Sequence, residues 1–272
     1  MELIVFDLDG TLLDRGSVVS EHTGETLKKL RQRGIAYTVA TGRTLHAARD
    51  LLQGHGFALP QIYKNGVMIW QPEEAQYSHC SLLTDEEIRS VVEAFNSAQV
   101  TPFIFTLEPE NHHVVYHGPL RNDGERRLTT MFAKDRGLAL LPIEQMPPKS
   151  DISNISALGT ADAIASVQAL VDTQAHLVAY SGVALDKDWH WMDVHHSAAS
   201  KGSAIEQLKQ DLGFSRVICF GDSDNDLSMF EMADECYAPA NAKEQVLSVA
   251  TAVIGHHDED GISRFLRERF EL

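Results

Sequence analysis

Four groups of polar residues in this sequence combine carboxylates, hydroxyls and basic side chains in a way that suits the binding of a cation and a phosphate. They are Asp7-Leu8-Asp9-Gly10-Thr11, Thr41-Gly42-Arg43, Lys201-Gly202 and Gly221-Asp222-Ser223-Asp224-Asn225-Asp226. Three of the groups follow a short apolar run directly, and Lys201 opens an amphipathic segment. These residue types predict a site for phosphoryl chemistry, provided that the fold brings the four groups together.

Aspartates dominate the first and the last group. Asp7 and Asp9 are two residues apart, so on a continuing strand both side chains would point to one face. Asp222 and Asp226 add two more carboxylates. Crowded carboxylates repel one another unless positive charge lies among them, and hard oxygen ligands suit Mg²⁺. The alternative is that these aspartates only cap helices and form turns, but turn formation does not require a strand end each time.

The elements that must position these groups are strands and helices in alternation. The run Leu3–Phe6 is apolar throughout, as in a strand buried on both faces. A helical segment around 26–33, a strand at 35–40, a helix at 45–54 and a strand at 61–63 follow, and the alternation returns from 201 onward. This order predicts an α/β fold with a doubly wound parallel sheet. Ligands bind beyond the carboxyl ends of such strands, so distant groups would converge there.

The middle of the chain has a different pattern. Candidate strands at 102–107, 112–117 and 153–158 are mixed with helical segments in a α+β order. We therefore predict a second domain inserted into the first. The predicted boundaries are 1–77 and 185–272 for the catalytic core and 78–184 for the insert.

Composition limits the classes of partner. The chain has 272 residues, of which 39 are acidic and 23 are Lys or Arg, for a formal charge of −16. Such a surface repels nucleic acid, so we expect a small phosphorylated metabolite in a focused site. The apolar runs are only a few residues long, whereas a membrane span needs about 20. The absence of a leader-like start and three widely spaced cysteines favour a cytoplasmic location. Oligomeric state is unknown from the sequence.

The four groups resemble the signatures of the haloacid dehalogenase (HAD) superfamily of phosphatases. The D-x-D-G-T-L signature matches Asp7 to Leu12, Thr41 and Lys201 follow in order, and G-D-x-x-N-D matches Gly221 to Asp226. Thr41-Gly42-Arg43, Asn65-Gly66 and Ser200-Lys201-Gly202 resemble the Cof-type subgroup of sugar-phosphatase-like members. The resemblance implies a Rossmann-like core with a large α/β (C2-type) cap that sets substrate specificity. The insert matches that cap in architecture only.

The resemblance also implies a role for each matching residue. Asp7 would be the nucleophile that forms an aspartyl phosphate, and Asp9 the general acid and base. The Asp7 carboxylate, the Asp9 carbonyl and Asp222 would bind Mg²⁺, with Asp226 in support. The residues implied to hold the phosphate are Thr41, Gly42, Lys201 and Asn225. The residues that could line the substrate rim are Arg43, Asn65 and His196.

The implied activity is Mg²⁺-dependent hydrolysis of small phosphomonoesters, with sugar phosphates as the first choice. Pyridoxal or flavin-type phosphates are an alternative, and so is a phosphomutase or phosphotransferase that uses the same aspartyl phosphate. A signalling receiver domain and a non-catalytic phosphate sensor fit less well, because the insert and the complete set of acids have no role there.

Single residues also have structural interpretations. Lys201 could be a solvated surface lysine, and Thr41 could be the N-cap of the helix that begins near Leu45. The adjacent pair His256-His257 could suggest zinc, but neighbouring histidines on a strand point to opposite faces, which disfavours chelation.

Overall fold

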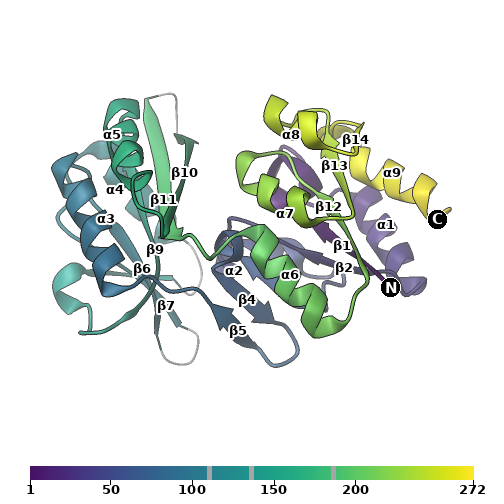
Figure 1. The fold of residues 1–272 in the computed structure, drawn as a ribbon, viewed down its shortest axis with the longest axis horizontal. Coiled ribbons are helices and arrows are strands. Elements are labelled where there is room, and N and C mark those ends of the chain that lie inside the picture. Colours follow the sequence, from purple (N-terminus) through teal and green to yellow (C-terminus); the bar gives the residue numbers. More distant parts are fainter. Residues whose placement is uncertain (109–111, 135–137, 185–187) are drawn as a thin grey trace. The chain divides into compact units, whose positions relative to one another are not determined.

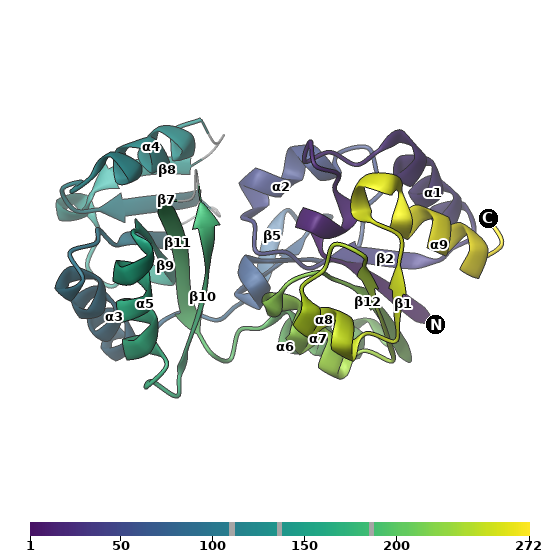
Figure 2. The ribbon, with the colours of Figure 1, turned by 90° about the horizontal axis from the view of Figure 1, so that it is seen from above.

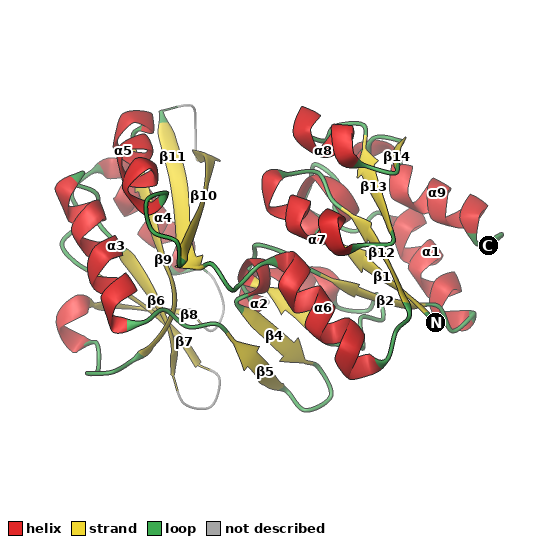
Figure 3. Cartoon of the chain, in the orientation of Figure 1, coloured by secondary structure: helices red, strands yellow, loops and turns green. Residues whose placement is uncertain are grey.

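The computed structural model describes residues 1–108, 112–134, 138–184 and 188–272. The chain forms two compact units, which we call the core unit (Met1–His79 with Ala199–Leu272) and the inserted unit (Cys80–Ala198). Figure 1 follows the chain through both units, and Figure 3 distinguishes helices from strands. The predicted architecture, an α/β core interrupted by a second domain, is confirmed.

The core unit is built on a parallel sheet with the strand order β14-β13-β12-β1-β2. The strands are β1 (Glu2–Phe6), β2 (Ala36–Val39), β12 (Arg216–Phe220), β13 (Glu235–Pro239) and β14 (Ala252–Ile254). The helices are α1 (Glu21–Gln32), α2 (Leu45–Leu52), α6 (Lys201–Leu212), α7 (Leu227–Met232), α8 (Glu244–Val249) and α9 (Gly261–Arg269). Next to β2, a bridge from Ala40 to Ile62 leads into a smaller sheet of β3 (Gln61–Tyr63), β4 (Met68–Gln71) and β5 (Gln76–Cys80).

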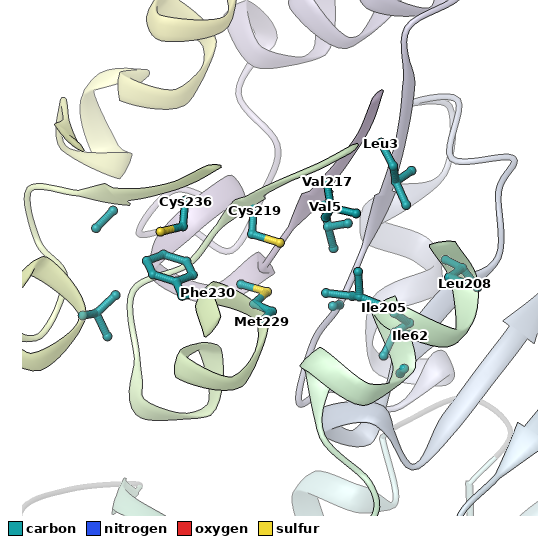
Figure 4. Close-up of a cluster of buried hydrophobic side chains, with 14 of the residues drawn as sticks. Leu3, Val5, Ile62, Ile205, Leu208, Val217, Cys219, Met229, Phe230 and Cys236 are labelled. Atoms are coloured by element: carbon teal, nitrogen blue, oxygen red, sulfur yellow. The ribbon is translucent and has the colours of Figure 1, made fainter. Parts of the chain in front are cut away.

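The strand β1 lies inside the sheet because both of its faces are apolar. Successive side chains of a strand point to opposite faces, and Leu3 and Val5 pack with Ile205 of α6 and Met229 of α7 in one buried cluster (Figure 4). On the other face, the Phe6 ring lies 5.2 Å from the Phe220 ring, measured between centroids. Both faces are therefore covered, which explains the unbroken apolar run that follows Glu2.

Helices α1 and α9 lie side by side in the core unit (Figures 1 and 2). Phe265 of α9 packs against the aromatic rings of β12 and β13, with centroids 5.9 Å from Phe220 and 4.3 Å from Tyr237. Burial of large aromatic rings contributes strongly to a core. The sheet is thus doubly wound, as predicted.

The inserted unit is a mixed sheet with the order β10-β11-β9-β6-β7-β8. Its strands are β6 (Phe103–Glu108), β7 (His112–His117), β8 (Leu138–Pro142), β9 (Asp151–Gly159), β10 (Leu177–Ala184) and β11 (Trp189–His196). Its helices are α3 (Asp85–Ser97), α4 (Asp123–Phe132) and α5 (Ala161–Val171). Ile104 packs with the cluster under α3 and α5, which lie side by side in Figure 2, whereas Phe103 and Phe105 pack against α4. Successive side chains of β6 therefore pack on opposite faces of the sheet, one face toward α3 and α5 and the other toward α4.

The boundaries of the inserted unit differ from the predicted 78–184. The unit begins at Cys80 and continues to Ala198, because β11 pairs with both β9 and β10 and so belongs to the same sheet. The predicted break at 184/185 borders residues 185–187, which lie outside the described residues. In the described part of the chain, every helix is too short or too polar to cross a membrane.

Close packing of α6 on α7 gives a first prediction. A Cβ at Gly202 would lie 2.1 Å from the Ser228 carbonyl oxygen, and backbone cannot yield as a flexible side chain does. We expect Gly202→Ala to lower the free energy of unfolding by about 1–3 kcal/mol through overpacking. The control is Gly118→Ala, where a Cβ would meet nothing within 4 Å. Urea unfolding of both variants measures the difference, and equal stabilities would contradict the packing argument.

Candidate active site

The carboxyl ends of β1 and β12 bring the first and the last polar group together. Phe6 is the parallel partner of Phe220, and the Asp7 N–H donates to the Phe220 carbonyl at 2.9 Å. Gly221 and Asp222, which follow the end of β12, therefore leave the sheet beside Asp7. This is the convergence that the parallel-sheet argument predicted.

Lys201 completes this cluster from the first turn of α6. Ser200 caps the helix by accepting from the Ser203 N–H at 3.0 Å. The Lys201 Nζ lies 2.5 Å from Asp7 Oδ1 and 2.6 Å from Asp226 Oδ1. Its side chain is 0% exposed, so the interpretation as a solvated surface lysine is wrong. Burial alone would lower the pKa of Lys201, but Asp226 and Asp7 outweigh it and hold the pKa above its usual value.

The Asp226 carboxylate accepts hydrogen bonds at both of its oxygens. One oxygen accepts from Lys201, and the other accepts from the backbone N–H groups of Asp222 and Ser223 at 2.8 and 2.9 Å. A carboxylate bound in this way organises the loop after β12 and orients the lysine. The role predicted for Asp226 in support of a metal stays a prediction.

The three carboxylates form a set that fits a divalent cation. Ligand oxygens of Asp7, Asp222 and Asp226 all lie within 4.8 Å of one another. One lysine among three carboxylates leaves negative charge uncompensated. Burial raises the pKa of Asp7, opposed by Lys201 and reinforced by Asp226 and Asp222. Burial and Asp226 also raise the pKa of Asp222 to about 6. A hard cation such as Mg²⁺ would supply the missing positive charge, because it prefers oxygen ligands of this kind.

Asp9 does not share a face of β1 with Asp7, so the prediction of a continuing strand was wrong. The strand ends at Phe6, and the chain enters a tight turn in which the Leu12 and Leu13 N–H groups donate five residues back to the Asp7 and Leu8 carbonyls, at 3.3 and 2.9 Å. Within this turn Gly10 has φ +72, and a Cβ there would lie 2.4 Å from Asp222 Oδ2. Glycine thus permits both the left-handed turn and its close approach to Asp222.

The Asp9 side chain instead makes a two-pronged ion pair with Arg43. Arg43 Nε donates to Oδ2 at 2.7 Å and Nη2 donates to Oδ1 at 2.6 Å. The aspartate side chain is 55% exposed. Planar guanidinium–carboxylate pairing of this kind fixes orientation as well as distance. Arg43 therefore fixes the direction of the Asp9 carboxylate.

The second polar group joins the site through β2 and β3. Thr41 follows the Ala40–Ile62 bridge, and its N–H donates to Ile62 at 3.0 Å. Its buried hydroxyl accepts from the Arg43 N–H at 3.1 Å. The N-cap of α2 is Thr44, which accepts from the Ala47 N–H. The interpretation of Thr41 as this N-cap is therefore wrong.

Asn65 links the second group to the fourth. Its side-chain oxygen accepts from Asn225 Nδ2 at 2.8 Å, and its backbone has φ +55. Gly42 packs against it so closely that a Cβ would lie 3.1 Å from Asn65 Oδ1. The structure thus brings together Asp7, Thr41, Gly42, Asn65, Lys201, Asp222, Asn225 and Asp226 in the core unit, although they are distant in sequence.

A family model described as haloacid dehalogenase-like hydrolase matches residues 4–266. The chain belongs to this family. The predicted family is therefore confirmed, and the residues of the site described above lie within the matched segment.

Relatives of this HAD-like hydrolase carry the names of phosphatases. It is 25% identical to a 5-amino-6-(5-phospho-D-ribitylamino)uracil phosphatase of Bacillus subtilis, over 99% of this chain and 98% of the relative. It is 26% identical to a pyridoxal phosphate phosphatase of Escherichia coli, over 97% of each chain. A solved haloacid dehalogenase-like hydrolase from B. subtilis superposes with a TM-score of 0.80 at 22% identity, over 98% of this chain and 99% of the other. That structure shows the shared fold.

His196, predicted at the substrate rim, lies in the inserted unit of this HAD-like hydrolase. Its Nδ1 accepts from the Ala198 N–H at 3.0 Å, and its Nε2 lies 3.6 Å from Glu87 of α3. Its ring packs on His176 with centroids 6.4 Å apart. These contacts place it at the end of β11 against α3.

Sequence reasoning missed two residues that hold the Asp7–Leu13 turn. Asn241 Nδ2 donates to the Gly10 carbonyl at 2.8 Å, and His257 Nδ1 contacts the Leu13 carbonyl at 2.8 Å. The only signal was the crowding of polar residues after β13 and β14, and a histidine pair was considered only as a metal site. The reason given against that metal site was also wrong, because the pair lies in a turn and ligand atoms of His256, His257 and Asp258 come within 4.8 Å.

Proposed function

We propose that this HAD-like hydrolase is a Mg²⁺-dependent phosphatase that hydrolyses small phosphorylated metabolites through an aspartyl phosphate on Asp7. The observation that carries the proposal is the buried cluster at the ends of β1 and β12. There the Asp7 carboxylate lies beside the buried Lys201 ammonium and the carboxylates of Asp222 and Asp226. A phosphomonoester needs these groups, because the nucleophile and the ester are both anions.

The reaction is a double displacement at phosphorus. An Asp7 carboxylate oxygen attacks phosphorus, the bond from phosphorus to the leaving alcohol breaks, and Asp9 gives its proton to the departing oxygen. Water then attacks the phosphorus of the aspartyl phosphate, Asp9 takes the water proton, and the bond to Asp7 breaks. Inorganic phosphate and free Asp7 result.

The Asp7 and Asp222 carboxylates and the Asp9 carbonyl would hold Mg²⁺, whose positive charge would offset the repulsion between the anionic nucleophile and the anionic ester. Asp226 keeps Lys201 and the loop after β12 in place. Lys201, the Thr41 hydroxyl, Gly42 and Asn225 are proposed to hold the phosphoryl oxygens as their charge redistributes.

Arg43 is proposed to orient Asp9 and, with Asn65, to meet the substrate. Its guanidinium already binds both oxygens of Asp9, so Asp9 must exchange this ion pair for the leaving oxygen during turnover. His196 is proposed to contact the leaving group. We also propose that the inserted unit determines which leaving group is accepted.

Sugar phosphates are the first proposed substrates, on the Cof-type resemblance. Pyridoxal phosphate and a flavin-precursor phosphate come next, because relatives of the chain are named for these activities. A phosphomutase would use the same aspartyl phosphate but return the phosphoryl group to a sugar hydroxyl. The product separates the two classes. The cytoplasmic location expected from the cysteines stays a prediction.

The proposal is tested by assaying a panel of phosphate esters for released inorganic phosphate. The panel contains hexose and pentose phosphates, pyridoxal phosphate and a ribitylaminouracil phosphate, each with Mg²⁺ and with EDTA. We expect phosphate release with Mg²⁺, its fall to background with EDTA, and its return when excess Mg²⁺ is added. Turnover that survives EDTA would refute the metal dependence, and an isomerised ester without free phosphate would identify a mutase.

Proton competition at Asp222 gives a pH prediction. Because the pKa of Asp222 is raised to about 6, its carboxyl takes up a proton as the pH falls through that value and then ligates Mg²⁺ poorly. We expect the Mg²⁺ concentration for half-maximal activity to rise below about pH 6 and to be steady above about pH 7. A Mg²⁺ requirement that does not change between pH 5 and pH 8 would contradict this role of Asp222.

A further inference from the structure

The turn that carries Asp9 is held from outside by two side chains. The Gly10 carbonyl accepts from Asn241 Nδ2 at 2.8 Å, and the Leu13 carbonyl receives the His257 ring at 2.8 Å. The two side chains are themselves linked, because the His257 N–H donates to Asn241 Oδ1 at 3.2 Å. They form one hydrogen-bonded chain from the turn before α9 to the Asp7–Leu13 turn, which we call the catalytic turn.

The partners fix the orientation of both side chains. A carbonyl oxygen can only accept, so the His257 Nδ1 that faces Leu13 must carry the proton. The Asn241 amide must place its oxygen toward the His257 N–H and its nitrogen toward Gly10 for the same reason. Each bond therefore depends on a donor at one defined atom.

The segment that presents His257 is closely packed and bound to the chain that follows the Asp7–Leu13 turn. A Cβ at Gly261 would lie 1.9 Å from the Gly255 carbonyl oxygen, so the two ends of this turn pack backbone against backbone. The Asp258 carboxylate accepts from the Arg15 backbone N–H at 2.6 Å and pairs with the Arg15 guanidinium at 2.8 Å. Ser20 donates to Asp260 at 2.5 Å. The chain after the catalytic turn is thus tied to the same segment at two further points.

We propose that Asn241 and His257 are positioning residues that set the catalytic turn, and with it the carbonyl and the carboxylate of Asp9. This inference rests on the proposed function, because it gives Asp9 its importance. Gly10 packs directly against Asp222, so a shift of the turn changes the distance between Asp9 and the metal-binding carboxylates. The hydrogen-bond donor of His257 carries the effect, not its aromatic ring or its charge.

Two variants of His257 separate the donor from the rest of the side chain. In His257→Asn the amide nitrogen stands as many bonds from the backbone as the ring Nδ1 and still donates to Leu13. In His257→Asp an oxygen occupies that place and faces the carbonyl. We expect His257→Asn to keep kcat within about threefold of the parent and His257→Asp to lower it by about 10–100-fold, with KM nearly unchanged. Asn241→Asp, which places an oxygen against Gly10, is expected to resemble His257→Asp.

A second measurement needs no activity. Amide hydrogen exchange of Leu12 and Leu13 reports the turn directly, since both N–H groups close it. We expect parental protection in His257→Asn and faster exchange in His257→Asp. If His257→Asp does not fold, His257→Leu removes the donor without adding a charge, and the same two measurements apply.

The inference is overturned if His257→Asn loses as much activity and protection as the variants without a donor, or if those variants match the parent. The failure of the proposed function has a different signature. In that case the parent protein releases no phosphate from any ester, while the exchange comparison still shows whether Asn241 and His257 hold the turn.

Discussion

Asp7→Asn is expected to lower kcat for phosphate release by about 10⁴-fold or more, because an amide cannot act as the nucleophile. The same change should leave the fold intact. Burial raises the pKa of Asp7 in the folded protein above its unfolded value, so the neutral form is the one that folding favours. The amide oxygen can still accept from Lys201, whose Nζ lies 2.5 Å from Asp7 Oδ1.

The measurement pairs steady-state kinetics with thermal unfolding. The control is Asp50→Asn, an exposed aspartate on α2 that lies 3.5 Å from Arg49 Nε. It should match the parent in both assays. If Asp7→Asn melts at the parental temperature and keeps kcat within about tenfold of the parent, the covalent mechanism is refuted. If Asp7→Asn is unfolded under conditions in which the parent is folded, the argument that folding favours the neutral form of Asp7 is refuted.

Asp226→Asn is expected to lower the free energy of unfolding by about 3–5 kcal/mol, because it breaks a buried ion pair on one side. Both oxygens of Asp226 accept, one from Lys201 and one from two backbone N–H groups. An amide has a single acceptor, so its NH₂ must face either an ammonium or two N–H donors. Lys201 is 0% exposed, so bulk solvent does not reach its ammonium to replace the lost partner.

The control for Asp226 is its neighbour Asp224. Asp224 also pairs with a lysine, Lys243, at 2.6 Å, but these side chains are 47% and 55% exposed. Solvent-exposed pairs contribute about 0–1 kcal/mol, so Asp224→Asn should unfold in urea almost as the parent does. The comparison is made with EDTA present, which removes any contribution of a bound cation. Equal stabilities of the two variants would contradict the structural importance of the Lys201 pair.

Much of the core unit could be predicted from local sequence. The run after Glu2 and the run 217–220 are marked by unbroken apolar character, and the helix from Lys201 to Leu212 is marked by helical spacing with a glycine at the end. Such patterns depend on neighbours in the chain, which the sequence shows directly. Convergence at the ends of β1 and β12 then follows from parallel pairing alone.

The features that were not predicted depend on partners distant in the chain. The strand β11 alternates Trp, His, Met and Asp without an apolar run, and only its pairing with β9 and β10 makes it a strand. The turn at Gly10 and the pairing of Asp9 with Arg43 need the positive φ and the neighbouring loop to be known. Asn241 and His257 carry no motif, since they act through backbone oxygens of another segment.

The position of β1 between β2 and β12 has a consequence for synthesis of the chain. Ribosomes produce β12 only after the entire inserted unit. One edge of the apolar strand β1 therefore stays unpaired until β12 has been synthesised. We expect Cys80–Ala198 to reach its compact state first and the parallel sheet to close late, since contacts between distant segments form slowly. Nascent chains arrested before residue 216 should therefore engage holdase chaperones that the finished protein no longer needs.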